Sequence, residues 1–380
     1  MKKYKIFIST AKNLVPYLHQ ELLRLGFKDS SVLNTGVFLG ADFGEIMQLN
    51  LALRSANHIF LLVKEFACVN PEELYRQVAN IEWESLISED GFISIFSNVS
   101  NPTIRDNRFA NLKCKDAIVD RLVRIKGRRP DSGSSREKTV IYLYWADNHC
   151  SIYIDTSGES LSKRGYRKIP LKAPLQETLA AAIILATNWQ RKTHFINPMC
   201  GSGTLAIEAA YMALNRAPGI LRNNFGFMHT KLFDKALFEK IRENLRKNEN
   251  KNLNFRIIAT DIDKNAMDAA HKNASLAQVE KFIEFKTCDY RQTPIPEPPG
   301  ILIINPEYGI RLGSVSELET LYEEMGDFLK QKCSGFTAYI FSGNIPLLKK
   351  VGLRPQRKLI FYNADIECRL CEYPLYEGSK

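Results

Sequence analysis

A polar motif follows directly on an apolar run near residue 305. Residues 301–304 are Ile-Leu-Ile-Ile, and Asn305, Pro306, Glu307 and Tyr308 come next. The run predicts a strand, and in open α/β sheets ligands bind at the carboxyl ends of strands. The Asn305 side-chain oxygen and the Pro306 carbonyl can accept hydrogen bonds, and the Tyr308 ring can stack on a flat group. The motif therefore predicts a site for a planar substrate that carries an amino group.

A glycine-rich turn follows an earlier apolar run. Residues 195–204, Phe-Ile-Asn-Pro-Met-Cys-Gly-Ser-Gly-Thr, predict a strand, a tight turn and the start of a helix. Gly201 and Gly203 let the backbone approach a ligand closely, and a helix amino terminus attracts negative charge. The turn alone is weak evidence, because many such turns are only tight connections. It is neither a Walker A loop nor a G-x-G-x-x-G dinucleotide fingerprint, because the residues that define those motifs do not follow.

Two carboxylates stand at the ends of later predicted strands. Asp261 ends an apolar run, where a carboxylate can accept two hydrogen bonds from a ribose diol. Asp289 can reach an adenine amino group, or it is a solvated loop carboxylate. Asp263 fits better as the N-cap of the next helix. The glycine turn, Asp261 and the Asn305 motif are far more specific together than any one of them alone.

Strands and helices that hold these residues alternate after residue 175. Such alternation over some 200 residues predicts a largely parallel sheet covered on both faces. Residues 1–65 have a β-α-β-β-α pattern, and residues 60–156 predict a strand, a helix, a strand, a basic helix and a hairpin. The polar insertion at 215–254 is either an exposed surface or a lid over the site.

The length, the net charge and the cysteine content of the chain limit the class of protein. The chain has 380 residues and a net charge of +10, which favours a polyanionic partner. No apolar stretch approaches the roughly 18–20 residues that cross a bilayer, and the start lacks the apolar core of a signal peptide. The eight cysteines are scattered, so we expect reduced thiols and no metal site. We expect a cytoplasmic protein without a membrane partner, and the sequence leaves monomer or homodimer open.

Two basic runs are candidates for RNA phosphate contact. A charge run is usually only a solvated face, but two such runs, on a predicted helix and at a predicted domain junction, favour phosphate binding. The first run has no acidic residue within it, and the second is interleaved with a tyrosine. The candidates are Arg121, Arg124, Lys126, Arg128 and Arg129, and then Lys163, Arg164, Tyr166 and Arg167.

The whole chain resembles a family of RNA-modifying enzymes. It is similar to the class I, S-adenosylmethionine-dependent 23S ribosomal-RNA guanine-N2 methyltransferases that carry a THUMP domain, of the RlmL-like, N-terminal-half type. Many motifs match in order, so chance similarity is negligible. The matching stretches are 115–120, 154–159, 163–167, 177–182, 198–210, 305–309 and 363–372.

The resemblance implies an α/β architecture in several parts. It implies a ferredoxin-like subdomain at 1–60, a THUMP RNA-binding domain at 61–157, a basic linker at 158–174 and a Rossmann-like methyltransferase domain at 175–380. The last part would hold a mostly parallel seven-stranded sheet with an antiparallel final strand.

The resemblance also assigns the site. S-adenosylmethionine would be the methyl donor and a guanine of large-subunit ribosomal RNA the acceptor. Asn305, Pro306 and Tyr308 would hold the guanine. The implied donor-binding residues are Asn197, Pro198, Cys200, Gly201, Gly203, Thr204, Asp261, Ile262 and Asp289.

Two positions depart from the family pattern. Asn197 stands where the family usually has Asp, and Glu307 stands where it has Pro. Proline at 307 would hold residue 306 in an extended conformation and fix its carbonyl, and glutamate relaxes that constraint. The chain is then either a slower enzyme or a catalytically impaired RNA-binding or ribosome-assembly protein. Methylation of DNA adenine or of a protein glutamine is a third hypothesis, which the THUMP-like half disfavours.

Overall fold

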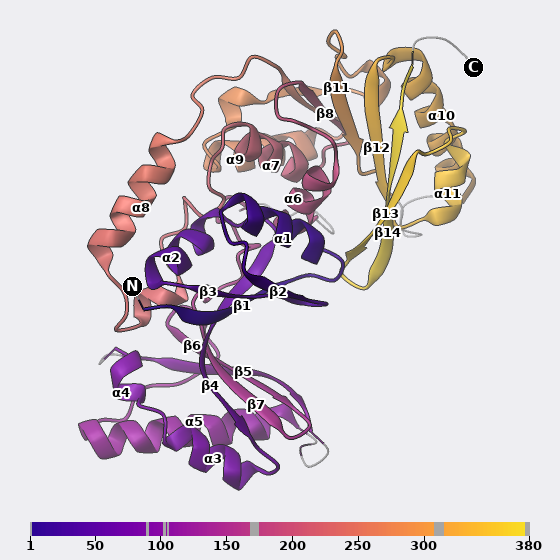
Figure 1. Ribbon diagram of the computed structural model, residues 1–380. Coiled ribbons are helices and arrows are strands. Elements are labelled where there is room, and N and C mark those ends of the chain that lie inside the picture. Colours follow the sequence, from indigo (N-terminus) through magenta and orange to yellow (C-terminus); the bar gives the residue numbers. More distant parts are fainter. Residues whose placement is uncertain are drawn as a thin grey trace. The chain divides into compact units, whose positions relative to one another are not determined.

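The structure is a computed structural model that describes residues 2–88, 91–101, 104, 106–167, 175–307 and 315–376. The chain divides into two compact units (Figure 1). The N-terminal unit comprises Met1–Thr10, Leu18–Leu161 and Arg222–Asn244. The C-terminal unit comprises Ala11–Tyr17, Ser162–Leu221 and Leu245–Lys380. Each unit is built around its own seven-stranded sheet.

The sheet of the N-terminal unit is one continuous sheet made of two groups of strands. Its strand order is β2-β3-β1-β4-β7-β6-β5, and only the β5–β6 pair is parallel. The long strand β4 pairs with β1 on one side and with β7 on the other. It therefore connects the group β2-β3-β1 to the group β7-β6-β5. The strands are β1 Tyr4–Thr10, β2 Ser30–Leu33, β3 Gly36–Ala41, β4 Ala56–Ala67, β5 Ile93–Ser100, β6 Thr139–Ala146 and β7 His149–Asp155.

Helices of this unit cover one face of the sheet. Trp145, Ile141 and Ile152 are fully buried in the core beneath α3 and α5. The α5 helix ends at Gly127, whose φ of +69° suits a residue without a side chain. The helices are α1 Val15–Arg24, α2 Phe43–Ala52, α3 Pro71–Ala79, α4 Trp83–Leu86, α5 Asn107–Lys126, η1 Gly226–His229 and α8 Lys235–Lys247.

Part of the insertion predicted at 215–254 belongs to the N-terminal unit. The Arg222 guanidinium donates to the carbonyls of Ser157 and Ser160, and the Thr139 hydroxyl donates to the His229 carbonyl at 3.0 Å. Arg222 is itself buried. Residues 222–230 therefore complete the packing of this unit, which neither interpretation anticipated. In α8 only Phe238 is buried, which agrees with the expectation of an exposed surface for this helix.

The C-terminal unit holds the alternating part of the chain. Its strand order is β10-β9-β8-β11-β12-β14-β13, with parallel pairing from β10 through β12 and antiparallel pairing of β14 with both neighbours. The predicted mostly parallel sheet with an antiparallel final strand is confirmed. The strands are β8 His194–Pro198, β9 Ile257–Asp261, β10 Glu284–Thr287, β11 Gly300–Ile304, β12 Phe336–Ser342, β13 Arg357–Asn363 and β14 Ile366–Pro374.

The strand order of this sheet reverses at the ends of β8 and β11. The chain passes from β8 outward to β9 and β10, and then returns to β11 on the other side of β8, so the order reverses between β8 and β11. Ligands of open α/β sheets bind at such a switch point. The helices are α6 Glu177–Ala186, α7 Thr204–Ala213, η2 Glu280–Phe282, α9 Lys264–Leu276, η3 Tyr290–Gln292, α10 Val315–Lys332 and α11 Ile345–Lys350.

Two further findings concern the described part of the chain. No helix there is both long and apolar enough to cross a membrane. No group of three or more histidine, cysteine or acidic side chains gathers there as a metal site. The eight cysteines are all free, and only Cys200 is more than slightly exposed.

Candidate functional site at the ends of two central strands

Asn197 ties the two central strands together. Its amide Nδ2 donates to the Ile303 carbonyl of β11 at 2.9 Å, and the residue is fully buried in β8. The carboxylate that the family usually has here could not donate this bond. The Asn197 Oδ1 atom is buried and has no hydrogen-bond partner among the described residues. Asn197 therefore aligns the strand ends and leaves one acceptor unused.

The glycine turn is held close to the neighbouring strand. Gly201 and Gly203 have φ angles of +55° and +81°, which only glycine adopts without strain. A Cβ on Gly203 would stand 3.0 Å from the Cβ of Ala270, so a side chain there would press on α9. The Cys200 N–H donates to the Thr260 carbonyl at 3.0 Å. The turn thus presents its backbone with little side-chain cover before α7 begins at Thr204.

Asp261 anchors this turn from the end of β9. Its carboxylate accepts hydrogen bonds from the Gly201 N–H at 2.9 Å and from the Asp263 N–H at 3.0 Å. Each oxygen keeps a lone pair for a further donor. Ile262 beside it is 72% exposed, so an apolar side chain lies at the surface next to Asp261. Asp263 caps α9 through the Asn265 N–H, so its predicted structural role is confirmed.

Pro198 and Cys200 line the turn without an evident chemical role. Pro198 is buried and pairs with Thr260 in the sheet. The Cys200 sulfur lies 3.7 Å from the Met267 sulfur, and burial raises the pKa of the thiol. Cys200 therefore stays protonated and packs as an apolar group.

Asp289 is engaged by a neighbour. Arg291 donates to both of its carboxylate oxygens, at 2.8 and 2.9 Å, and this lowers the pKa of Asp289. The Asp289 side chain also caps the short helix η3. These bonds favour the structural alternative for Asp289 over contact with a ligand.

The Asn305 motif places an unused acceptor at the end of β11. Strand β11 ends at Ile304, and the Asn305 Oδ1 atom next to it is buried without a hydrogen-bond partner among the described residues. Pro306 is buried and Glu307 is exposed. Tyr308 lies outside the described residues, so its stacking role stays a prediction.

Tyr322 supports the motif and was not predicted. Its hydroxyl lies 2.7 Å from the Ser342 hydroxyl and donates weakly to the Glu307 carbonyl at 3.5 Å. Tyr322 is fully buried in α10 and Ser342 ends β12. The position of a tyrosine in an amphipathic helix gave no sign of this contact, because a buried ring alone satisfies the same pattern.

The second basic run is mostly buried, which changes its interpretation. Arg164 and Tyr166 are each 1% exposed, and both contact the Glu208 carboxylate of α7. Arg167 donates to the Thr204 hydroxyl at 2.9 Å and to the Leu175 carbonyl at 2.6 Å. Burial leaves Arg164 and Tyr166 no surface for phosphate, so these side chains fix their segment to α7. Lys163 is exposed, and residues 168–174 of the predicted linker lie outside the described part.

The first basic run is divided between a structural bridge and exposed cations. Arg121 donates to both Glu84 oxygens, at 2.9 and 2.6 Å, and only 13% of its side chain is exposed. Arg124, Arg128 and Arg129 are exposed at the end of α5 and just beyond it, and Lys126 is half-buried. Phosphate contact therefore stays a proposal for these four residues and is disfavoured for Arg121.

Comparison with known protein families decides the identity of the fold. Residues 164–372 match the family described as the RMKL-like methyltransferase domain. The chain belongs to this family. Residues 5–60 match the RlmL ferredoxin-like domain and residues 68–155 match the THUMP domain, so the recognised family and the predicted fold class are confirmed.

Individual relatives agree with this assignment. The chain is 38% identical to "Ribosomal RNA large subunit methyltransferase K/L" of Psychromonas ingrahamii, over 97% of this chain and 50% of the relative. This chain thus spans about half the length of that relative. It is 32% identical to "Putative RNA methyltransferase slr0064" of Synechocystis, over 97% of this chain and 96% of the relative. The crystal structure of SMU.472 complexed with SAH has 29% identity and a TM-score of 0.89, covering 100% of both chains.

Proposed function

We propose that this chain transfers a methyl group from S-adenosylmethionine to the exocyclic N2 of a guanine in large-subunit ribosomal RNA. The observation that carries the proposal is the buried, unpartnered Oδ1 of Asn305 at the end of β11. A buried acceptor without a donor is costly, and a substrate N–H would satisfy it. An RNA substrate is supported by three findings: the match to the methyltransferase family, the match to the THUMP domain, and the relative named "Ribosomal RNA large subunit methyltransferase K/L".

The methyl donor fits the glycine turn. S-adenosylmethionine supplies a methyl group on a positively charged sulfur. The expectation of this donor is confirmed at the level of the family, and the SMU.472 structure contains its product form, SAH. In this chain the backbone at Gly201 and Gly203, the Asp261 carboxylate and the exposed Ile262 are the residues that we propose hold it. Asp289 is a weaker candidate because Arg291 occupies its oxygens.

Methyl transfer to guanine N2 requires orientation of the amino group more than it requires a general base. The lone pair of a guanine amino group is delocalised into the ring, which makes the nitrogen a poor nucleophile. Asn305 Oδ1 and the Pro306 carbonyl accept hydrogen bonds from its two N–H groups and turn the lone pair toward the methyl carbon. As the bond from N2 to the methyl carbon forms, the bond from sulfur to that carbon breaks. S-adenosylhomocysteine is then the leaving group, and the methylated nitrogen releases one proton to water. Positioning of this kind can supply several kcal/mol of the barrier reduction. We propose that Tyr308 stacks on the base after the guanine leaves its own stack, which costs a few kcal/mol.

Glu307 is the one observation in favour of a second candidate function, that of a catalytically impaired RNA-binding protein. Its exposed carboxylate stands where the family has proline, so the Pro306 carbonyl loses one conformational constraint. Buried Tyr322 supplies a partial substitute through its contact with the Glu307 carbonyl. We therefore prefer an active enzyme of reduced rate over an inactive scaffold.

The test compares the unmodified chain with Glu307→Pro and Asn305→Ala. Methyl incorporation from labelled S-adenosylmethionine is measured on ribosomal RNA that lacks the modification, and the methylated nucleoside is identified by mass spectrometry. We expect N2-methylguanosine from the unmodified chain, a faster rate from Glu307→Pro, and a loss on the order of 100-fold from Asn305→Ala.

Donor affinity, measured by calorimetry, is the control and should stay the same in all three proteins. Activity only after Glu307→Pro would favour the impaired scaffold. No activity in any of the three would contradict the enzyme assignment.

A further inference from the structure

An aromatic row crosses the sheet of the N-terminal unit. Six neighbouring strands, in the spatial order β3-β1-β4-β7-β6-β5, each contribute one ring to the same face. The aromatic row consists of Phe38, Phe7, Phe60, Tyr153, Tyr142 and Phe96.

Direct ring contacts run along this row. The Phe7 ring centre lies 4.8 Å from that of Phe38 and 6.4 Å from that of Phe60. Phe60 in turn lies 4.6 Å from Tyr142 and 6.0 Å from Tyr153. Neighbouring strands are about 4.8 Å apart, so a row over six strands spans roughly 24 Å. Five of the rings, Phe38, Phe7, Phe60, Tyr142 and Tyr153, are therefore linked by direct contacts, and Phe96 is opposite Tyr142 in the register of β5 and β6.

The row is partly accessible. Phe60 and Tyr153 are 6% exposed and form its floor, whereas Phe7, Phe38, Tyr142 and Phe96 are half-buried. Tyr144, two residues along β6 on the same face, is 41% exposed. The strongly apolar residues that alternate with these rings, such as Ile6 and Ile141, are fully buried on the other face.

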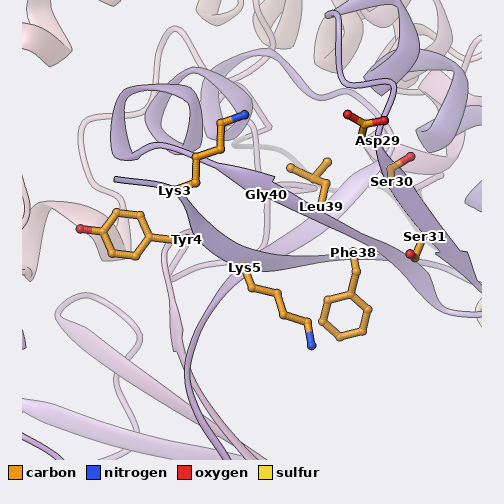
Figure 2. A pocket seen from close by; sticks show the side chains of 9 residues that line it. All are labelled: Lys3, Tyr4, Lys5, Asp29, Ser30, Ser31, Phe38, Leu39 and Gly40. Carbon is orange, nitrogen blue, oxygen red and sulfur yellow. The ribbon is translucent and has the colours of Figure 1, made fainter. Parts of the chain in front are cut away.

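A cationic group lies over the ring at each end. The Lys5 ammonium is 5.0 Å from the centre of the Phe38 ring, and the Arg136 guanidinium is 3.6 Å from that of Phe96. Figure 2 shows Lys5 and Phe38 directed to the same side of their strands, at an open hollow of about 520 Å³. Glu65 pairs with Lys5 at 3.2 Å, and buried Asp155 pairs with Arg136 at 3.2 Å. Each cation is therefore held over its ring by an acidic partner.

We propose that the aromatic row is a stacking platform for single-stranded RNA. The proposal rests on the proposed function only in taking RNA as the substrate. Unpaired bases stack on aromatic rings and on guanidinium planes, and a four-stranded sheet with aromatics on its central strands is a known solution. Here β2-β3-β1-β4 is a four-stranded part of the seven-stranded sheet, with Phe38 and Phe7 opposite each other on its two central strands. The Arg136 guanidinium over Phe96 adds a flat group of the kind on which bases also stack.

The test measures binding of the full chain to a labelled 12-nucleotide RNA without self-complementarity, by fluorescence anisotropy. We expect Phe7→Leu combined with Phe38→Leu to weaken binding about tenfold, because leucine keeps the apolar volume but removes the stacking faces. The slope of log Kd against log salt should not change, since no phosphate contact is lost. A duplex of the same length should bind the two proteins equally, because its bases are already stacked.

Matched variants make the result specific. Phe109→Leu changes an exposed ring on α5, outside the row, and should leave affinity within twofold. Phe38→Tyr keeps a ring and should retain the affinity. Circular dichroism melting shows whether each variant folds. Equal affinity of a folded double variant and the unmodified chain would overturn the proposal.

Photocrosslinking gives a second measurement that needs no variant. RNA with 5-iodouridine at each position in turn is irradiated with the unmodified chain, and crosslinked peptides are identified by mass spectrometry. Adducts on Phe7, Phe38, Tyr142 or Tyr144 support the platform, and adducts confined to other segments overturn it. Neither measurement depends on methyl transfer, so RNA stacking without methylation would contradict the proposed function alone.

Discussion

At the scale of single residues, two buried oxygens at the strand ends have no hydrogen-bond partner among the described residues, and they belong to Asn197 and Asn305. The sequence predicted that Asn305 follows a strand end, because a polar residue comes directly after an apolar run. Its role in binding the guanine stays a prediction. The sequence could not show that Asn197 uses its Nδ2 to join β8 to β11, since that bond depends on which strands are neighbours.

The Glu84–Arg121 bridge gives a pH-dependent prediction at this scale. The double hydrogen bond from Arg121 lowers the pKa of Glu84 from an ordinary 4.5 to about 2. A lowered pKa in the folded state stabilises the protein above pH 4.5, and this contribution is lost as the pH falls toward 2. Both side chains are partly exposed, so we expect Arg121→Met to lower the free energy of unfolding by only about 1 kcal/mol at pH 7.

Urea unfolding followed by circular dichroism measures this difference. The gap between Arg121→Met and the unmodified chain should shrink as the pH falls from 7 to 3. A gap that is equal at both pH values would show that Arg121 acts through packing. Fully retained RNA affinity in the variant would agree with the structural role of Arg121.

At the scale of elements, the strand ends were predictable and the buried charges were not. Alternating apolar runs indicated the parallel sheet, and the residues after β8, β9 and β11 do gather at one edge. The burial of Arg164 and Tyr166 was not predictable, because a charge run looks the same in the sequence whether it is exposed or paired. One signal was available: Glu208 is the only charged residue in the otherwise apolar α7, which implies a buried cationic partner.

Arg167 provides a test of this corrected role. It bonds the Thr204 hydroxyl, which begins α7 directly after the glycine turn. We expect Arg167→Met to weaken donor binding severalfold, measured by calorimetry, because the helix start loses its support. The salt dependence of RNA binding should not change. A slope reduced by about one would instead indicate a phosphate contact by Arg167.

At the scale of the whole molecule, the proposed RNA-binding and catalytic residues belong to different units. The N-terminal unit has exposed cations on and beyond α5 and the aromatic row, and the C-terminal unit has the strand ends at which we propose that donor and acceptor bind. The sequence predicted this order of parts, but it left the role of the insertion open, because residues 222–230 pack on strands that lie far earlier in the chain. Sequence periodicity reports local structure and carries no information about such distant packing.

The central claim is that this chain methylates guanine N2 in large-subunit ribosomal RNA. The most direct measurement is mass spectrometry of nucleosides from that RNA, isolated from cells with and without the gene. The account predicts that N2-methylguanosine falls by one residue per ribosome without the gene and returns when the gene is restored, but not with Asn305→Ala. An unchanged level of N2-methylguanosine, or the loss of a different methylated nucleoside, would contradict it.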